Sequence, residues 1–115
     1  MKVKLKIKVI GDESFFLETV GIKNDNTIKY LEKDLKVLIK ILDNSIIIER
    51  SNDDYQVIIN LEENKETVST YKFIGGNKTF ELKTKTSLLL IDDKKIRAKY
   101  NLEGNDFEFI LEVIE

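Results

Sequence analysis

The chain has 115 residues, 42% of them hydrophobic, and a formal net charge of −2, which is the composition of one ordinary globular domain. It contains no Cys, His or Pro, so disulfides, thiolate chemistry, imidazole bases and imidazole metal ligands are excluded. Only Arg50 and Arg97 of its 19 cationic residues are arginines, and the near balance of charge argues against a nucleic-acid-binding protein. We expect a single domain over residues 1–115, with no cofactor.

No segment has the features of a targeting or membrane-spanning sequence. The start, residues 1–10, alternates lysines with aliphatic residues and lacks the continuous apolar stretch of a signal peptide. The longest aliphatic run, residues 88–91, is far shorter than the ~20 residues that span a bilayer. We therefore expect a cytoplasmic protein that binds neither membrane nor nucleic acid.

Alternation of apolar and polar residues with a period of two runs along the whole chain and predicts β-strands. At the start, Val3, Leu5 and Ile7 alternate with lysines. The same pattern, interrupted by short Asn-, Asp- and Gly-rich turns, predicts further strands at residues 15–23, 27–33, 35–41, 45–51, 54–61, 66–74, 78–90, 95–102 and 107–115. Residues 31–42 could also form a helix face, but their β-branched content and the hairpin turn at 43–44 favour a strand.

Short connections between these strands predict an antiparallel meander, and such a sheet must close or pack on a second sheet because open edges invite aggregation. The terminal strands favour closure. The first carries lysines on its outer face, and the last carries Glu108 and Glu112 there, so antiparallel pairing sets opposite charges across from each other. The sequence therefore predicts an all-β protein, an antiparallel up-and-down barrel of about 8–10 strands.

The turns also predict which residues pair across strands. Two-residue turns at 33–34, 43–44 and 52–53 place Tyr30, Val37, Arg50 and Tyr55 in one row of the inward face. A turn at 76–77 pairs Phe73 with Phe80, Tyr71 with Leu82 and Ser69 with Thr84. A four-residue loop at 103–106 pairs Tyr100 with Phe109 inside the barrel and Arg97 with Glu112 outside it.

In these registers the inward face carries polar groups as well as the core isoleucines. The candidate ligand-binding residues are Arg50, Tyr55, Tyr30, Tyr71, Thr84, Thr86 and Tyr100. One interpretation is a cavity in which Arg50 meets an anion and the tyrosines shape the walls. The other is a packed core in which Arg50 and the tyrosine hydroxyls satisfy one another, Glu32 or the backbone near the barrel rim.

The glycine-rich segment and the acidic pairs of the sequence are predicted to lie in turns. Residues 74–77 are glycine-rich but lack the Lys-Ser/Thr of a phosphate-binding loop, so we predict a hairpin turn. The acidic pairs at 53–54, 62–63 and 92–93 lack the spacing of a calcium loop, so we predict solvated carboxylates and no metal site. Because no nucleophile, base and orienting group are arranged together, we expect a non-enzymatic protein. An enzyme using Glu32, Arg50 and tyrosines stays open as an alternative.

The same registers turn Leu38, Ile47 and Ile58 outward on three consecutive strands, with Ile47 and Ile58 as direct neighbours. A contiguous apolar cluster rimmed by charged residues is typical of a contact surface, and a self-complementary one suits a two-fold homodimer. The alternative is that three aliphatic residues are too few, or that the N-terminal segment covers them.

Segments in the middle and C-terminal parts resemble a known family. Lys36-Val-Leu-Ile-Lys-Ile41, Ile46-Ile-Ile-Glu-Arg-Ser51, Tyr71-Lys-Phe73 and Phe80-Glu-Leu-Lys-Thr-Lys-Thr86 are similar to the YwiB-like family of small bacterial proteins, and Thr19-Val-Gly21 and Tyr100 fit as well. The resemblance implies a calycin-type barrel, the architecture of lipocalins and fatty-acid-binding proteins, in a family with no established biochemical function. It supplies no site.

We therefore expect a calycin-like barrel that binds a small, partly apolar or anionic ligand in its interior. The alternative from a different class is a protein–protein interaction module with a filled core. The volume of the interior separates the two, since a cavity of a few hundred Å³ favours a ligand and a filled interior favours the interaction module.

Overall fold

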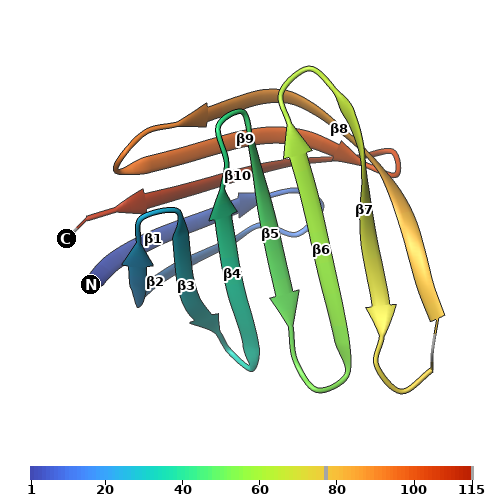
Figure 1. The fold of residues 1–115 in the computed structure, drawn as a ribbon, viewed down its shortest axis with the longest axis horizontal. Helices are drawn as coiled ribbons and strands as arrows, with labels where there is room; N and C mark the ends of the chain where they lie inside the picture. Colours follow the sequence, from blue (N-terminus) through green and yellow to red (C-terminus); the bar gives the residue numbers. More distant parts are fainter. Residues whose placement is uncertain (77, 115) are drawn as a thin grey trace.

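The computed structural model describes residues 1–76 and 78–114 as one antiparallel sheet of ten strands that closes on itself (Figure 1). The strands are β1 (Lys2–Ile10), β2 (Phe15–Asn24), β3 (Thr27–Glu32), β4 (Leu35–Ile41), β5 (Ser45–Ser51), β6 (Tyr55–Glu62), β7 (Glu66–Phe73), β8 (Lys78–Ile91), β9 (Lys95–Leu102) and β10 (Asn105–Val113). The predicted all-β, up-and-down barrel is confirmed. Asn77 and Glu115, which the sequence assigns to a turn and to the last strand, lie outside the described residues.

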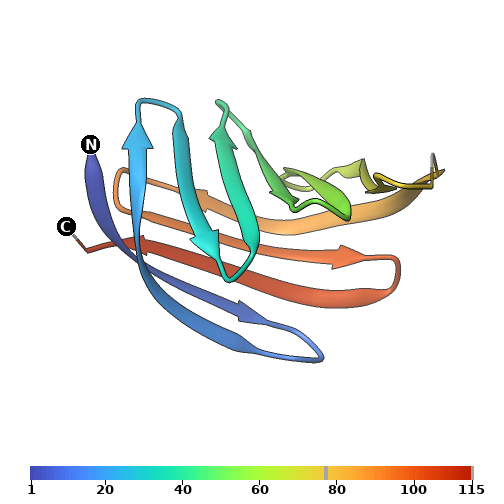
Figure 2. The same ribbon diagram turned by 90° about the horizontal axis from the view of Figure 1, so that it is seen from below.

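Pairing between β1 and β10 closes the barrel and brings the two ends of the chain side by side (Figures 1 and 2). On the outer face Lys6 lies opposite Glu112, and on the inner face Ile7 lies opposite Leu111. The predicted meeting of opposite charges across the closing pair is therefore confirmed for this pair of residues. The described residues contain no helix long and apolar enough to cross a membrane.

The barrel is flattened into two layers whose strands cross. In Figure 1, β3 to β7 run in front of β1, β2, β9 and β10, and β8 bends from one layer into the other. The register of β8 against β9 shifts between Thr86 and Leu88. A bulge of this kind turns a strand through the corner of an orthogonally packed barrel.

Polarity inside the barrel changes from one row of cross-strand neighbours to the next. In one row Ile39, Ile48 and Ile59 lie side by side and are buried. Burial of each such side chain contributes about 1.5–3 kcal/mol to folding. The next row holds Arg50 between two valines. The aliphatic core therefore ends one residue pair away from a charged group.

A second corner lies in β2, at Gly21. β2 pairs with β1 over most of its length but with β3 only from Ile22 to Asn24. A Cβ atom on Gly21 would lie 2.5 Å from the carbonyl oxygen of Lys29 and 2.6 Å from Cδ1 of Leu5. Glycine is therefore needed where β3 approaches β2 closely.

Three hairpins have registers that differ by two residues from those predicted. Arg50 lies opposite Val57, so its predicted pairing with Tyr55 is wrong. In the other two hairpins, the observed pairs are Tyr71 with Phe80, Ser69 with Leu82, Tyr100 with Phe107, and Arg97 with Ile110. Because the side-chain period is two, every inward residue stays inward despite the shift.

The physical reason for the shifted registers lies in the turns. The side-chain oxygen of Asn52 accepts hydrogen bonds from the backbone N–H groups of Asp54 (2.8 Å) and Tyr55 (3.0 Å), so Asn52 flanks its turn and does not form its centre. Glu103 and Gly104 have φ values of 46° and 87°. Two successive positive φ angles are typical of a two-residue hairpin turn, which replaces the predicted four-residue loop.

The predicted contact cluster on the outer wall is less continuous than expected. Leu38, Ile47 and Ile58 are half-buried. Ile58 lies opposite Glu49 and Ile47 lies opposite Asn60, so the predicted direct pairing of Ile47 with Ile58 is wrong. The reason is the same two-residue shift of β6 against β5.

We predict that Gly21→Ala destabilises the barrel by about 1–3 kcal/mol, because the added methyl group meets backbone and a core leucine. Gly75→Ala is the matched control, since a Cβ atom there meets nothing within 4 Å, and its effect should stay within about 0.5 kcal/mol. Urea unfolding followed by circular dichroism measures both. Equal midpoints for the two variants would contradict the close approach at Gly21.

Candidate functional site

Arg50 of β5 lies inside the barrel near one end, where its Nη2 donates a hydrogen bond to Oε2 of Glu32 on β3. The side chains of Arg50 and Glu32 are 27% and 15% exposed, so solvent reaches the pair but does not surround it. A hydrogen bond between two charged groups is roughly twice as strong as a neutral one. The inward position of Arg50 is as predicted from the sequence, and its contact with Glu32 is the one expected for a packed core.

Two buried tyrosines, Tyr30 and Tyr100, lie in the field of this ion pair. Burial raises the pKa of the Tyr30 hydroxyl well above its usual value, the charge of Glu32 raises it further, and Arg50 opposes both. Burial raises the pKa of Tyr100 to about 12, again against the charge of Arg50. Both hydroxyls therefore stay protonated at neutral pH. The Tyr100 ring stacks on Phe107 with centroids 5.5 Å apart.

Three buried hydroxyl groups line the inner face of β7 and β8. Oγ of Ser69 and Oγ1 of Thr84 are 2.7 Å apart and share a hydrogen bond. Among the described residues, Oγ1 of Thr86 is buried without a hydrogen-bond partner. Thr86 lies opposite Tyr100 across the β8–β9 pair. A polar atom left unpaired in this way costs about 1–3 kcal/mol, which a bound polar group would recover.

Four aromatic side chains, which we call the aromatic shelf, extend the inner face beyond the closed part of the barrel: Tyr55, Tyr71, Phe73 and Phe80. Tyr55 stacks on Tyr71 at 5.4 Å, Phe73 meets Tyr71 edge to face at 5.0 Å, and Phe80 meets Phe73 at 6.3 Å. Phe73 and Phe80 are 45% and 49% exposed although they share the inward side of their strands. In Figure 2, β7 and the start of β8 extend past the turn between β9 and β10 in the opposite layer.

The strand registers connect the ion pair to the aromatic shelf. One inner row runs across β4 to β8 as Val37, Arg50, Val57, Tyr71 and Phe80. All seven ligand-binding candidates lie on the inner face, and Phe73 and Phe80 join them. These two phenylalanines are not among the candidates predicted from the sequence, although both share the inward side of their strands with Tyr71, which is a usable signal.

This arrangement is suited to holding a molecule that is apolar along one side and negatively charged at one end. The guanidinium offers charge, the tyrosine and threonine hydroxyls offer hydrogen bonds, and the aromatic shelf offers stacking. Among the residues that the structure describes, no group of three or more Asp and Glu side chains gathers as a metal site.

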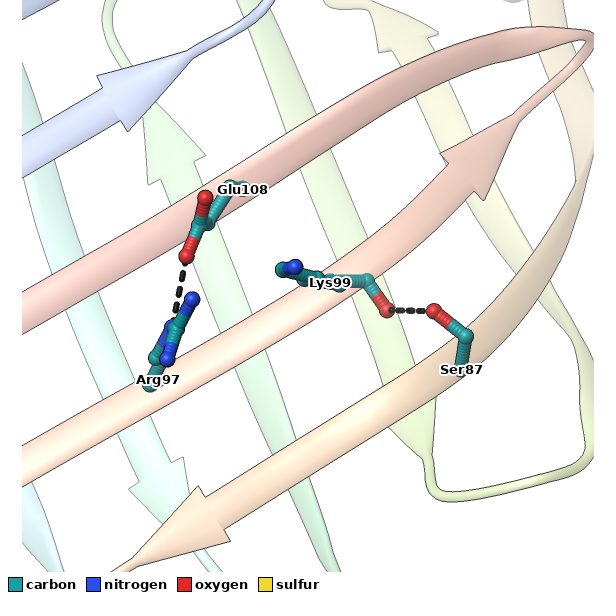
Figure 3. A network of polar contacts seen from close by, with 4 residues as sticks. All are labelled: Ser87, Arg97, Lys99 and Glu108. Carbon is teal, nitrogen blue, oxygen red and sulfur yellow. Dashed lines mark hydrogen bonds and ion pairs between the residues drawn. The ribbon is translucent and has the colours of Figure 1, made fainter.

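A second Arg–Glu pair on the outer wall gives an internal comparison (Figure 3). Nε of Arg97 on β9 donates to Oε2 of Glu108 on β10 at 2.6 Å, and these side chains are 38% and 18% exposed. Beside them, Oγ of Ser87 donates to the carbonyl oxygen of Lys99 at 3.3 Å. A hollow of about 990 Å³ nearby is lined by outward residues of both charges, such as Lys85, Lys99 and Glu108, and also by Thr86, Tyr100 and Phe107 from the inner face.

Comparisons with known proteins bear on the family and the fold. Residues 3–111 match the family model described as "Domain of unknown function (DUF1934)". The fold is similar to the crystal structure of the ywiB protein from Bacillus subtilis, with a TM-score of 0.72 and 20% identity over 97% of this chain and 88% of that chain. At this identity the similarity concerns the fold alone. The comparison with curated proteins finds no match. Because the family model spans nearly the whole sequence, the chain belongs to the DUF1934 family, and its resemblance to YwiB-like proteins is confirmed.

Proposed function

We propose that this protein binds a small amphipathic ligand at the open end of its barrel, with an anionic head group at Arg50 and an apolar body over the aromatic shelf. The observation that carries the proposal is the inward-facing aromatic shelf, of which Tyr71 and the half-exposed Phe80 lie in the same cross-strand row as Arg50. Large apolar side chains at the mouth of a small barrel are typical of a ligand entrance.

The head group would share Arg50 with Glu32. Glu32 contacts Nη2, and the fork-like guanidinium has further N–H groups on Nε and Nη1 that suit a carboxylate, sulfonate or phosphate oxygen. The hydroxyls of Tyr30 and Tyr100, which lie in the field of Arg50, are protonated and can donate to the same anion. The site therefore favours an anionic acceptor over a cationic or purely apolar group.

The length of the ligand follows from the width of the sheet. Arg50, on β5, and Phe80, on β8, lie three strands apart in one row. Strands are spaced about 4.8 Å apart, so the row spans about 14 Å. This is the length of a fused-ring system or of a medium-length acyl chain with its head group.

We propose a binding role and no catalysis. A tyrosine whose pKa is raised by burial is a poorer proton donor at neutral pH and is not ionised to act as a base. The competing interpretation, a filled core in which Arg50 serves only structure, rests on its contact with Glu32. Substitutions at Arg50 and Phe80 separate the two.

We predict that anilinonaphthalene sulfonate, an aromatic anion that fluoresces in apolar surroundings, binds the folded protein at this site. Arg50→Ala should weaken binding about tenfold or more, because a hydrogen bond to a charged group is lost. Phe80→Ala should also weaken it while leaving stability nearly unchanged, because Phe80 is half exposed. Fluorescence titration measures affinity, and urea unfolding measures stability.

The matched control is Arg97→Ala, which removes an arginine paired with a glutamate on the outer wall. Its affinity for the probe should equal that of the wild type. If Arg50→Ala lowers only the stability, and Arg50→Ala and Arg97→Ala bind the probe equally well, Arg50 is structural and the proposed site is wrong.

Glu32→Gln should tighten binding of the same probe several-fold. The substitution keeps the shape and a hydrogen-bond acceptor beside Arg50 but removes the carboxylate that competes with an anionic ligand. An affinity equal to or below that of the wild type, measured by the same titration, would show that the ligand does not reach the guanidinium.

The buried tyrosines predict how stability depends on alkaline pH. Their pKa values in the folded state lie above the ordinary value of 10.0, so below pH 10 folded and unfolded chains both keep the protons and stability is insensitive to them. Between pH 10 and about 12 the unfolded chain releases protons that the folded chain retains, so the free energy of unfolding should fall. Replacing both Tyr30 and Tyr100 by Phe should flatten this fall in urea titrations; an unchanged slope would contradict the burial of their hydroxyls.

A further inference from the structure

The first half of β2 has a free backbone edge. Met1 and Lys23 exchange two backbone hydrogen bonds of 2.9 and 3.3 Å. Hydrogen-bonded and non-hydrogen-bonded pairs alternate along an antiparallel ladder. In the register of β1 with β2, the odd-numbered residues of β2 therefore bond to β1, and the even-numbered residues direct their N–H and C=O groups to the other side.

On that other side β3 covers only the end of β2. Ile22 pairs with Lys29, and the next pair in the same register would be Val20 with Leu31, but the pairing of β2 with β3 stops at Ile22. Across the part of the chain that the structure describes, β2 from Phe15 to Val20 pairs with β1 alone. Phe16, Glu18 and Val20 thus present a row of unpaired backbone groups.

Exposed apolar side chains flank this edge. Phe16, Val20 and Leu31 are 59%, 56% and 62% exposed, and all point to the outer face. A groove of about 500 Å³ lies where the strands diverge, lined by Val20, Ile22, Leu31 and Leu38 among others. Proteins normally protect a free edge with lysine, proline or a bulge. Along this edge the one outward charged side chain is Glu18, and Lys6 lies opposite it on β1.

We propose that two copies of this chain associate through this edge, with β2 of each pairing antiparallel to β2 of the other about a two-fold axis. An isolated edge strand can pair with an identical strand in this way, and each copy then satisfies the backbone groups of the other. The result is a sheet that continues from one barrel into the next.

The register that pairs the most free residues centres the axis on Glu18. Phe16 then lies opposite the partner's Val20, Val20 lies opposite the partner's Phe16, and the two Glu18 side chains face each other. The apolar pairs stabilise the dimer and the facing carboxylates weaken it. Each Glu18 also has Lys6 of its own chain opposite it on β1. Across the four strands the charges therefore follow the order plus, minus, minus, plus.

Sedimentation equilibrium of the intact chain tests the proposal. We expect a monomer–dimer equilibrium, and amide hydrogen exchange should show protection of Phe16, Glu18 and Val20 that rises with protein concentration. The amides of Leu17 and Thr19 bond to β1 and should be protected at every concentration. A protein that stays monomeric at high micromolar concentration overturns the proposal, as does a dimer in which the three amides exchange freely.

Proline substitution separates the edge from the fold. Glu18→Pro removes an N–H that points to the free edge, so it should abolish the dimer and leave the barrel folded. The control Thr19→Pro removes an N–H bonded to β1 and should destabilise the barrel itself. Val20→Lys adds a charge at the edge without touching the backbone and should also yield a monomer. A dimer that survives both Glu18→Pro and Val20→Lys overturns the proposal.

Glu18→Gln tests the register. Removing the facing charges should tighten the dimer several-fold, and the same variant should make dimerisation less dependent on salt. Weaker association of Glu18→Gln than of the wild type would contradict the axis at Glu18.

Discussion

The pairing of β1 with β10 is the interaction on which the remaining structure depends. Without it, ten strands would form an open sheet with two long edges and one apolar face exposed to water. With it, Leu5, Ile7 and Leu111 become fully buried. Lys6 and Glu112 lie opposite each other on the outside, but burial of the aliphatic pair contributes more, since exposed charge pairs contribute ~1 kcal/mol or less.

The alternation of side chains explains why the faces of the strands could be predicted from the sequence. A strand has only two faces, and Val3, Leu5 and Ile7 cannot all be buried unless the lysines between them face outward. The number of residues in each turn could not be predicted in the same way. Asn52 looked like the centre of a turn because asparagine tolerates left-handed backbone, whereas it caps a neighbouring turn through its side chain.

The candidate site could be predicted from the sequence to the extent that it depends on which face of its strand each side chain occupies. Arg50, Tyr30 and Tyr100 share the parity of core isoleucines, and the structure places them inside the barrel. The exposure of Phe73 and Phe80 depends on which part of the opposite layer lies above them. That is set by the bend of β8 near Thr86 and Leu88, which is a property of the closed barrel and leaves no local pattern in the sequence.

Neighbouring strands also separate at two places, between β6 and β7 and between β2 and β3, and these two corners differ in how their backbone groups are satisfied. Between β6 and β7 the strand pairing stops at Ile58 and Thr70, and side chains replace the missing ladder. The backbone N–H of Asn60 donates to Oγ of Ser69 at 3.1 Å, and Nδ2 of Asn60 donates to the carbonyl oxygen of Val68 at 2.7 Å. The hydroxyl of Thr67 donates to the carbonyl oxygen of Asn60.

Between β2 and β3, by contrast, the residues at the split are Val20 and Leu31, whose side chains cannot take part in hydrogen bonds. A corner that closes with polar side chains needs no partner, because its backbone groups are satisfied within the chain. A corner flanked by exposed apolar residues leaves backbone groups to water in the monomer and gains by burying them with apolar contacts around them. The chemistry of the residues beside each corner, more than the bend itself, therefore distinguishes a sealed wall from a surface suited to association.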